Sequence, residues 1–413
     1  MRKQAITDWK LCGFWPYHPL LGQSLETQKD LEGVTPWIPV QVPGGIYQAL
    51  FAAGIIEDPY YGFNSLKCEW VANRWWIYKT TFPYRPAEGA KQVFLLFEGI
   101  DYEADILLNG KAIATHKGMY LPCKVDVSAS IRRGDNLLTV MFRHPPEEMG
   151  QIGYTSQTFT QKARFNYKWD FSTRMVNVGL YKGVYLLEQG ALTLEDIHVL
   201  QRDALAGDLC VEGRIGSQGG EWAKVTVECR HNRACVCRRE MTLPLDGEST
   251  AFSIPVAIDR PALWYPNGLG EQPLYCFDVT VHDQEGYISD CFSIETGLRK
   301  IEYRKNEHAP EDSLAYTVVI NNLPVYIKGV NMVPLDMEYG TVTAERYEKL
   351  VLQMKEANIN LVRVWGGGLI EDEEFYRLCD RHGLMVWQEF IQSSSGLDNV
   401  PSQKPEFLAL LQR

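Results

Sequence analysis

Several features that would point to a particular class of protein are missing from this sequence of 413 residues. The basic pair Arg2-Lys3 is not followed by the apolar segment of a secretory signal. No apolar run approaches the length of a membrane span. No basic patch or stripe accompanies the net charge of -11, although such a patch is the usual footprint of nucleic-acid binding. The sequence therefore predicts a protein that binds neither membranes nor nucleic acid.

The cysteines give no indication of a metal site. There are ten of them, scattered along the chain without any Cys-x-x-Cys pair, the spacing that structural zinc sites commonly use. Cys235 and Cys237 are spaced for one face of a strand. We expect free thiols in a reducing, cytoplasmic environment, and we expect no metal and no cofactor.

What residues 1–190 do contain is a series of short β-type segments separated by turns. The segments 75–82 and 93–97 are rich in aromatic and β-branched side chains. Asn109-Gly110 is the strongest short hairpin signal. Many short strands of this kind predict an antiparallel sandwich, here a jelly roll. One short helix is expected over 45–53, because its apolar residues fall on one helical face.

Residues 191–300 continue as short strands with turn signals. Strands are expected near 195–200, 223–229, 251–256 and 274–281. A loop is expected over 263–268, which contains Pro266 and Gly268. About 110 residues of this type suit a small immunoglobulin-like sandwich, and we interpret it as a spacer that orients its neighbours.

Residues 301–413 change to an alternation of strands and helices, which indicates a parallel sheet. A full eight-fold (β/α) barrel needs roughly 250 residues, so about three of its eight strands are expected here. The chain is thus predicted to be multidomain and mainly β, ending in the first three β/α units of a TIM barrel. The expected elements are a strand at 325–332, a helix after Thr343, a strand at 361–365, a helix ending at Gly383 and a strand at 384–390.

Four side chains fall near the carboxyl ends of these predicted strands, where barrels place functional groups. Strand alternation directs Arg363 into the barrel interior. A buried arginine keeps its charge, so it needs either an anionic ligand or a structural ion pair. Trp365 and Trp387 could stack on a sugar or fill the core. Glu389 is a carboxylate suited to gripping hydroxyl groups.

Three further motifs are weaker. Gly366-Gly367-Gly368 lacks the lysine and the spacing of phosphate-binding loops, so a tight loop is expected. The acidic cluster 371–374 is expected to be a solvated helix N-terminus, favoured by the helix dipole. Trp169-Asp170 places an aromatic ring beside a carboxylate in a polar stretch of the first domain.

Taken together, these residues resemble glycoside hydrolase family 2, and within it the β-mannosidase branch. The resemblance covers nearly the whole chain. The matching segments are 42–45, 58–62 and 76–78 in the jelly roll, 162–171 around a tryptophan–aspartate loop, and 329–331, 361–368 and 386–390 in the first three barrel strands.

The resemblance implies retaining hydrolysis of a terminal β-D-mannoside by two glutamates about 5–5.5 Å apart. Both are expected beyond Arg413, so no catalytic residue is expected in this chain and the chain alone is expected to be inactive. Trp169 and Asp170 resemble the loop that reaches the sugar subsite. Arg363 resembles the arginine beside the nucleophile. Trp365, Trp387 and Glu389 are at positions that resemble the wall of the family's sugar subsite.

The sequence departs from the family pattern inside the subsite. Phe171 and Ser172-Thr173 replace an aromatic residue and a glycine–proline pair, Glu389 replaces an aspartate, and the segment 391–396 is less aromatic. Another β-linked sugar therefore stays open: galactose, glucuronic acid or glucosamine. So does a non-catalytic carbohydrate-binding module. A separate chain carrying the missing barrel portion, or a second copy of this chain, would be the expected protein partner.

Overall fold

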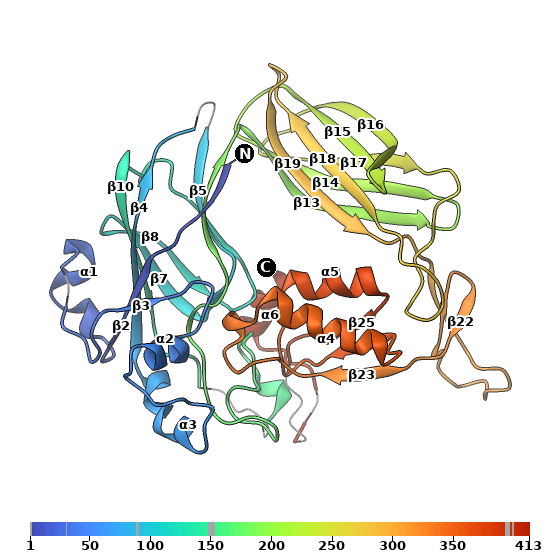
Figure 1. The fold of residues 1–413 in the computed structure, drawn as a ribbon. Coiled ribbons are helices and arrows are strands. Elements are labelled where there is room, and N and C mark those ends of the chain that lie inside the picture. Colours follow the sequence, from blue (N-terminus) through green and yellow to red (C-terminus); the bar gives the residue numbers. More distant parts are fainter. Residues whose placement is uncertain (1, 30, 88–90, 148–152, 393–396, 399) are drawn as a thin grey trace.

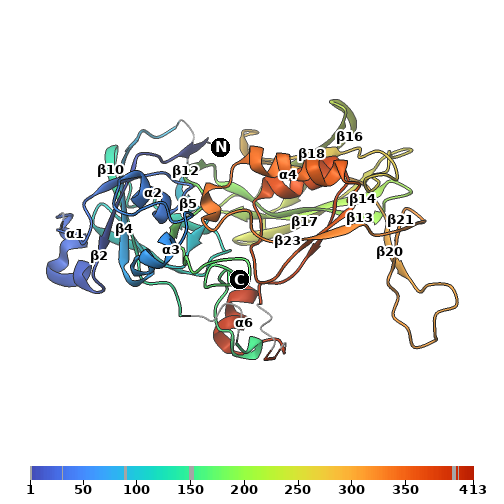
Figure 2. The same cartoon turned by 60° about the horizontal axis from the view of Figure 1, so that its bottom comes forward.

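The computed structural model describes residues 2–413 except 30, 88–90, 148–152, 393–396 and 399. It contains two β-sandwiches followed by a parallel sheet with helices, which confirms the predicted fold class (Figure 1). The helical unit lies beside both sandwiches in the two views (Figures 1 and 2). Within the described residues, no helix combines the length and the apolar character needed to cross a membrane.

The first sandwich packs a four-stranded sheet, β1-β12-β5-β9, against a six-stranded sheet, β3-β2-β4-β10-β7-β8. The four strands are β1 (Arg2–Ala5), β12 (Val184–Gln189), β5 (Gln92–Phe97) and β9 (Cys123–Asp126). The six are β3 (Ile38–Val40), β2 (Trp9–Phe14), β4 (Trp75–Tyr84), β10 (Gly134–Phe142), β7 (Glu103–Leu108) and β8 (Lys111–Lys117). The strands and the hairpin predicted here are confirmed, with Asn109 and Gly110 at φ 54° and 80°.

Short elements decorate this jelly roll. They are β6 (Ile100–Asp101) paired with β11 (Gly179–Leu180), and the helices α1 (Ser24–Thr27), α2 (Ile46–Ala52) and α3 (Asn64–Lys67). Short 3-10 turns occupy His18–Gln23, Glu69–Asn73 and Thr155–Gln157. The predicted helix over 45–53 corresponds to α2, which confirms it.

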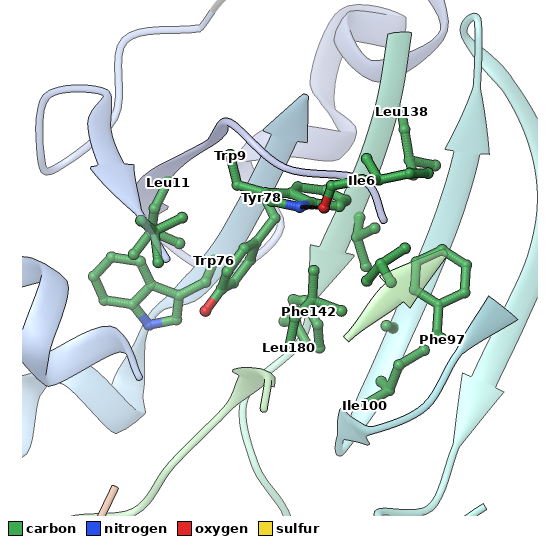
Figure 3. Packing of buried hydrophobic residues seen from close by; sticks show 14 of the residues in the cluster. Ile6, Trp9, Leu11, Trp76, Tyr78, Phe97, Ile100, Leu138, Phe142 and Leu180 are labelled. Atoms are coloured by element: carbon green, nitrogen blue, oxygen red, sulfur yellow. Dashed lines mark hydrogen bonds between the residues drawn. The ribbon is translucent and has the colours of Figure 1, made fainter. Parts of the chain in front are cut away.

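Both faces of the first half of the central strand β4 are buried, which explains the apolar run Trp75-Trp76-Ile77-Tyr78. Trp76 and Tyr78 point between the two sheets, where the Tyr78 ring meets Phe142 edge-on at 5.3 Å (Figure 3). Trp75 and Ile77 point the other way, into a smaller cluster beneath the N-terminal segment. Aromatic edge-to-face pairs add to the burial of these rings.

The second sandwich packs the sheet β13-β14-β17 against β16-β15-β18-β19. Its strands are β13 (Leu192–Asp203), β14 (Asp208–Ser217), β15 (Trp222–His231), β16 (Ala234–Pro244), β17 (Ser249–Ala257), β18 (Tyr275–His282) and β19 (Ile288–Thr296). Four of these were expected. The other three were not, because charged and glycine residues interrupt the apolar alternation of β14, β16 and β19.

The predicted loop 263–268 is a loop, and it attaches the second sandwich to the helical unit. Trp264 is fully buried and its indole N–H donates to the Asp380 carbonyl at 2.7 Å. The Asn267 side chain donates to the carbonyls of Lys355 and Ile359, each at 3.0 Å. The Lys355 carbonyl lies in the last turn of α4 and the Ile359 carbonyl lies just beyond the helix, so Asn267 fixes the end of the helix to the sandwich.

The third unit begins with a small antiparallel sheet and continues as a parallel one. The antiparallel strands are β20 (Ile301–Arg304), β21 (Thr317–Ile320) and β22 (Leu323–Val325). The parallel strands are β23 (Gly329–Met332), β24 (Leu361–Val364) and β25 (Met385–Gln388), with helices α4 (Ala344–Glu356), α5 (Glu373–His382) and α6 (Pro405–Gln412) and a 3-10 turn at Tyr339–Thr341.

The single strand predicted at 325–332 is wrong. The segment forms the end of β22 and the whole of β23, with residues 326–328 between them. β22 pairs back onto β21, whereas β23 pairs in parallel with β24. The chain must change partners between the two pairings, and the strongly apolar sequence carries no sign of that change.

The two ends of α5 follow the chemistry of their own residues, whereas the burial of Glu371, which precedes the helix, does not. Gly383 ends α5 with φ 79°, as predicted. Asp372 caps the start of α5 by accepting from the Glu374 N–H at 3.1 Å. The expectation that 371–374 is wholly solvated is wrong, because Glu371 is buried and accepts from the Tyr347 hydroxyl at 2.7 Å. Burial raises the pKa of Glu371 to about 7.

We predict that Asn267→Ala will loosen the attachment of α4 to the second sandwich. The carbonyls of Lys355 and Ile359 lose the hydrogen bonds from Asn267, which should cost about 1–3 kcal/mol. Denaturant unfolding monitored by tryptophan fluorescence should show a lower midpoint than the parent. Gln284→Ala, on an exposed turn of the same sandwich, is the matched control. An Asn267→Ala midpoint equal to that of the control would contradict the role assigned to this side chain.

Candidate functional site

Arg363 forms the centre of the site on the interior face of the parallel sheet. Its strand neighbours Val362 and Val364 are buried against the helices, so the arginine faces the opposite side, as alternation predicted. The parallel register aligns it with Asn331 on β23 and Trp387 on β25. The Asn331 side-chain oxygen accepts from the Arg363 guanidinium at 3.1 Å.

Glu389 supplies the carboxylate that Arg363 needs. One oxygen of Glu389 accepts from Arg363 Nε at 2.7 Å and lies 2.6 Å from Nη2. The other oxygen accepts from the Gly366 N–H at 2.9 Å. Of the two alternatives left open for Arg363, the structure therefore shows the ion pair. Glu389 holds the arginine and the start of the glycine loop together.

The glycine triplet forms a tight loop that another part of the chain contacts closely. A Cβ on Gly366 would lie 2.5 Å from the Phe390 carbonyl oxygen, and one on Gly367 would overlap the Trp365 ring. The Gly367 carbonyl accepts from two backbone N–H groups of the jelly roll, those of Arg164 and Phe165, each at 3.1 Å. The absence of side chains lets the loop fold tightly against Phe390 and Trp365.

That jelly-roll segment carries Trp169 and Asp170 on a small turn. The Trp169 N–H donates to the Ser172 carbonyl at 3.2 Å, and the reverse bond is 3.4 Å long, leaving Asp170 exposed at the tip. The ring centroid of Trp169 lies 4.8 Å from that of Trp365, and the Phe171 ring lies 6.0 Å from it. Three aromatic rings from two domains therefore meet beside Arg363.

The structure brings four of the six predicted residues into contact: Arg363 with Glu389, and Trp169 with Trp365. Asp170 is adjacent in sequence to Trp169 and is exposed. Trp387 is in register with Arg363, and its side chain is 57% exposed. The segment 391–396, noted for departing from the family pattern, lies partly outside the described residues.

Sequence reasoning missed two features of the site. Asn331 lies in the matched segment 329–331 but was not predicted to be a site residue, although its place on the first parallel strand could have suggested it. The second is a buried ion pair inside the jelly roll. Lys162 Nζ lies 2.6 Å from both Asp101 oxygens and donates to the Asn177 carbonyl at 2.8 Å. The hydroxyl of Tyr339, a residue of the helical unit, also donates to Asp101.

A second carboxylate, that of Glu338, also links the helical unit to the jelly roll. Glu338, from the helical unit, is buried and accepts from the Tyr47 N–H at the start of α2 at 2.8 Å. Burial raises the pKa of Glu338 to about 8, although the N–H groups of Tyr47 and Gln48 favour the charged form. The acid is therefore mostly protonated near neutral pH.

One sizeable cavity lies away from this cluster. It has a volume of about 770 Å³ and is lined by residues of the jelly roll and of α4 and α5, among them Tyr185, Thr341 and Glu371. None of the six predicted site residues, all of which are described, lines it. The Arg363 cluster is an open surface, because three parallel strands do not enclose a barrel interior. We place the site by its side-chain chemistry and not by the cavity.

In the described part of the chain, no group of three or more His, Cys, Asp and Glu side chains is arranged to hold a metal ion. The polar groups of the cluster pair with one another, and its apolar surface is aromatic. Such a surface suits a ligand with hydroxyl groups on one side and C–H groups on the other.

Two family models match the chain. Residues 23–182 match the glycosyl hydrolase 2 galactose-binding domain-like model, and residues 315–407 match the family 2 TIM barrel model. The chain is 30% identical over 423 residues to a β-mannosidase B from Aspergillus terreus, covering 95% of this chain and 48% of the relative.

Solved structures of two glycosidases are also similar to this chain. A β-D-mannosidase from Dictyoglomus thermophilum superposes with a TM-score of 0.82 at 30% identity, over 95% of this chain and 47% of that one. An exo-chitosanase from Amycolatopsis orientalis gives a TM-score of 0.72 at 21% identity, over 94% and 44%, and shares the fold. The chain spans about half the length of the relatives it matches.

We predict that Glu338→Gln will change how stability depends on pH. A folded pKa above the unfolded value means that the native state binds the extra proton between about pH 4.5 and 8, so this group's contribution to stability falls as pH rises through that window. Glu338→Gln cannot be ionised, so its stability does not fall in this way as pH rises. Its free energy of unfolding relative to the parent should rise by about 1–3 kcal/mol from pH 5 to pH 8.

Urea unfolding of parent and variant at several pH values measures this difference, since changes from other groups cancel. Glu345→Gln, an exposed acid at the start of α4, serves as control. A parent–variant difference that stays constant with pH would show that Glu338 is ionised in the folded protein.

Proposed function

Because this chain belongs to glycoside hydrolase family 2, we propose that the complete protein is a retaining exo-β-glycosidase that releases terminal β-D-mannose. The observation that carries the proposal is the meeting of Trp169 with Trp365 beside the Arg363–Glu389 pair. The likeness to β-mannosidases at 30% identity supports the choice of sugar.

The residues of this chain would bind and position the terminal sugar. The Trp169 and Trp365 rings offer apolar faces to the C–H side of the sugar ring. Asp170, at the tip of its turn, would accept hydrogen bonds from sugar hydroxyls. Trp387 would form the wall on the far side of Arg363.

Arg363 would act on the nucleophile. A guanidinium within a few ångströms of a carboxylate favours its charged form, which is the form that attacks the anomeric carbon. Asn331 and Glu389 fix the direction of that guanidinium. Glu389 is therefore proposed to position Arg363 and not to grip the sugar directly.

The chemical step in this proposal is a metal-independent double displacement by two glutamates, one as acid/base and one as nucleophile. We assign both glutamates to barrel strands other than the three described. These 413 residues alone would then bind a sugar without hydrolysing it. A chain that supplies the other strands would be the partner that completes the enzyme.

Two alternatives follow from particular observations. The exposed Asp170 and the aromatic cluster would equally serve a carbohydrate-binding module without catalysis. The departures at Phe171, Ser172-Thr173 and Glu389 lie at the sugar contact, so a β-linked galactose, glucuronic acid or glucosamine is the alternative substrate.

The test combines an assay with a binding measurement on the purified 413-residue protein. We expect no release of nitrophenol from the aryl β-D-mannoside, galactoside, glucuronide or glucosaminide. Calorimetry should detect mannose binding, weakened about tenfold by Trp169→Ala because one stacking face is lost. Trp222→Ala, in the second sandwich, is the control.

Turnover of any of these glycosides would refute the assignment of both glutamates to other strands. Stronger binding of one of the other three sugars than of mannose would replace mannose in the proposal. If Trp169→Ala leaves mannose binding unchanged, the tryptophan–aspartate loop does not contact the bound sugar.

A further inference from the structure

A polar network of buried side chains crosses the interface between the jelly roll and the helical unit. Lys162 is fully buried, and its ammonium nitrogen lies 2.6 Å from both oxygens of Asp101. The same nitrogen donates to the Asn177 carbonyl at 2.8 Å, so each of its three protons has an acceptor. The hydroxyl of Tyr339, from the helical unit, also donates to Asp101. We name Lys162, Asp101 and Tyr339 the buried network.

Asp101 is anchored to the core of the jelly roll. It lies on β6, in register with Gly179 on β11. The neighbouring residues of these two strands, Ile100 and Leu180, belong to the buried core cluster of the domain (Figure 3). Successive side chains of a strand point in opposite directions, which directs Asp101 away from that core and toward the helical unit. The carboxylate is therefore a fixed point of the first domain.

The helical unit approaches this point with a segment that is fixed at three successive residues, 337–339. The Met337 carbonyl accepts from the Asn177 side chain, and Glu338 accepts from the Tyr47 N–H at 2.8 Å. The hydroxyl of the third residue completes the buried network. Because hydrogen bonds depend on angle as well as on distance, three in succession restrict how the segment can slide along the jelly roll.

The ring of Tyr339 connects the network to the aromatic rings of the sugar site. It lies in a buried cluster with Ala163, Phe165 and Leu369, and Trp365 packs against that cluster. The centroids of the Tyr339 and Phe165 rings are 6.2 Å apart. Closely packed side chains transmit a displacement to their neighbours, so the position of Tyr339 affects that of Trp365.

Lys162 connects the network in the other direction, to Trp169. It lies two residues before Arg164, whose N–H donates to the Gly367 carbonyl at 3.1 Å. Residues 162–167 are all buried, and Trp169 lies two positions beyond them. A segment that is packed along its length moves as a unit, so the ion pair of Lys162 fixes the place where Trp169 emerges from the jelly roll.

We propose that the buried network positions the two tryptophan rings of the sugar site. Its ion pair holds the segment that carries Trp169, and its tyrosine hydroxyl holds the cluster against which Trp365 packs. The network thereby sets the contact between the two rings, whose centroids are 4.8 Å apart, and with it the affinity for the terminal sugar. This role rests on the proposed function and deepens it, because it adds three positioning residues that do not touch the sugar.

The chemistry of the network suits a positioning role better than a stabilising one. A buried ion pair contributes little net stability, because desolvation of the two charges offsets their attraction. Breaking such a pair is costly, since the remaining charge is left buried without its partner. The native arrangement is therefore favoured over arrangements in which the domains have shifted and the network is broken. An apolar contact of the same size would tolerate more sliding, because the hydrophobic effect has no preferred direction.

The test is Tyr339→Phe in the 413-residue protein, which removes the hydroxyl that joins the network across the interface and keeps both the aromatic ring and the ion pair. Two indole rings in contact couple electronically and give an exciton couplet in circular dichroism. The part of the couplet that Trp169→Phe abolishes reports on the contact of Trp169 with Trp365. Well below the melting temperature, Tyr339→Phe should diminish that part. Calorimetry should show mannose binding weakened by about three- to thirtyfold, the range expected for a residue that couples distant groups.

Tyr347→Phe is the matched control. The Tyr347 hydroxyl also donates to a buried carboxyl group, that of Glu371 at 2.7 Å, but both residues belong to the helical unit. Each variant loses one buried hydrogen bond of the same kind, so both should unfold at a lower temperature than the parent. Only Tyr339→Phe should change the couplet and the affinity for mannose. Lys162→Met is unsuitable, because it leaves Asp101 without its ion-pair partner and the protein can fail to fold.

The outcomes separate this inference from the function on which it rests. If the couplet and the mannose affinity of Tyr339→Phe equal those of Tyr347→Phe, the network only stabilises the fold and the inference fails. A diminished couplet with unchanged mannose binding also overturns it, because the contact between the two rings then does not set the affinity. If the parent binds no mannose, the proposed function fails by itself, and the couplet still decides whether Tyr339 positions the rings.

Discussion

The docking of one jelly-roll segment onto the glycine loop of the barrel is the contact on which the rest of the site depends. Two backbone N–H groups of the jelly roll, those of Arg164 and Phe165, share the Gly367 carbonyl. Backbone groups buried in such a contact need a partner, so the two segments hold each other at one distance. Trp169, five residues after Arg164, is thereby carried onto Trp365.

Buried polar side chains reinforce that docking. The Lys162–Asp101 pair lies inside the jelly roll, and Tyr339 reaches it from the helical unit. Glu338, the residue before Tyr339, reaches α2 in the same way. A buried ion pair adds little net stability, but breaking one is costly. Such contacts therefore fix the geometry between the domains more than they contribute to overall stability, and fixed geometry is what a sugar site requires.

The elements that local sequence patterns describe could be predicted well. The Asn109-Gly110 hairpin, the end of α5 at Gly383 and the inward direction of Arg363 each follow from the chemistry of a few adjacent residues. The split between β22 and β23 could not be predicted, because it depends on which distant strand each segment pairs with. The burial of Glu371 also depends on a distant residue, since the partner of its carboxylate is Tyr347 on another helix.

The sequence by itself determined the type of each domain and the residues that resemble a glycosidase family, because periodicity and short motifs are local properties. Only the tertiary structure decided that Glu389 is the partner of Arg363 and that Trp169 lies against Trp365. The reason is that Trp169 and Trp365 belong to different domains, whereas Arg363 lies on β24 and Glu389 follows the end of β25. What each side chain can do depends on the neighbour that folding places beside it.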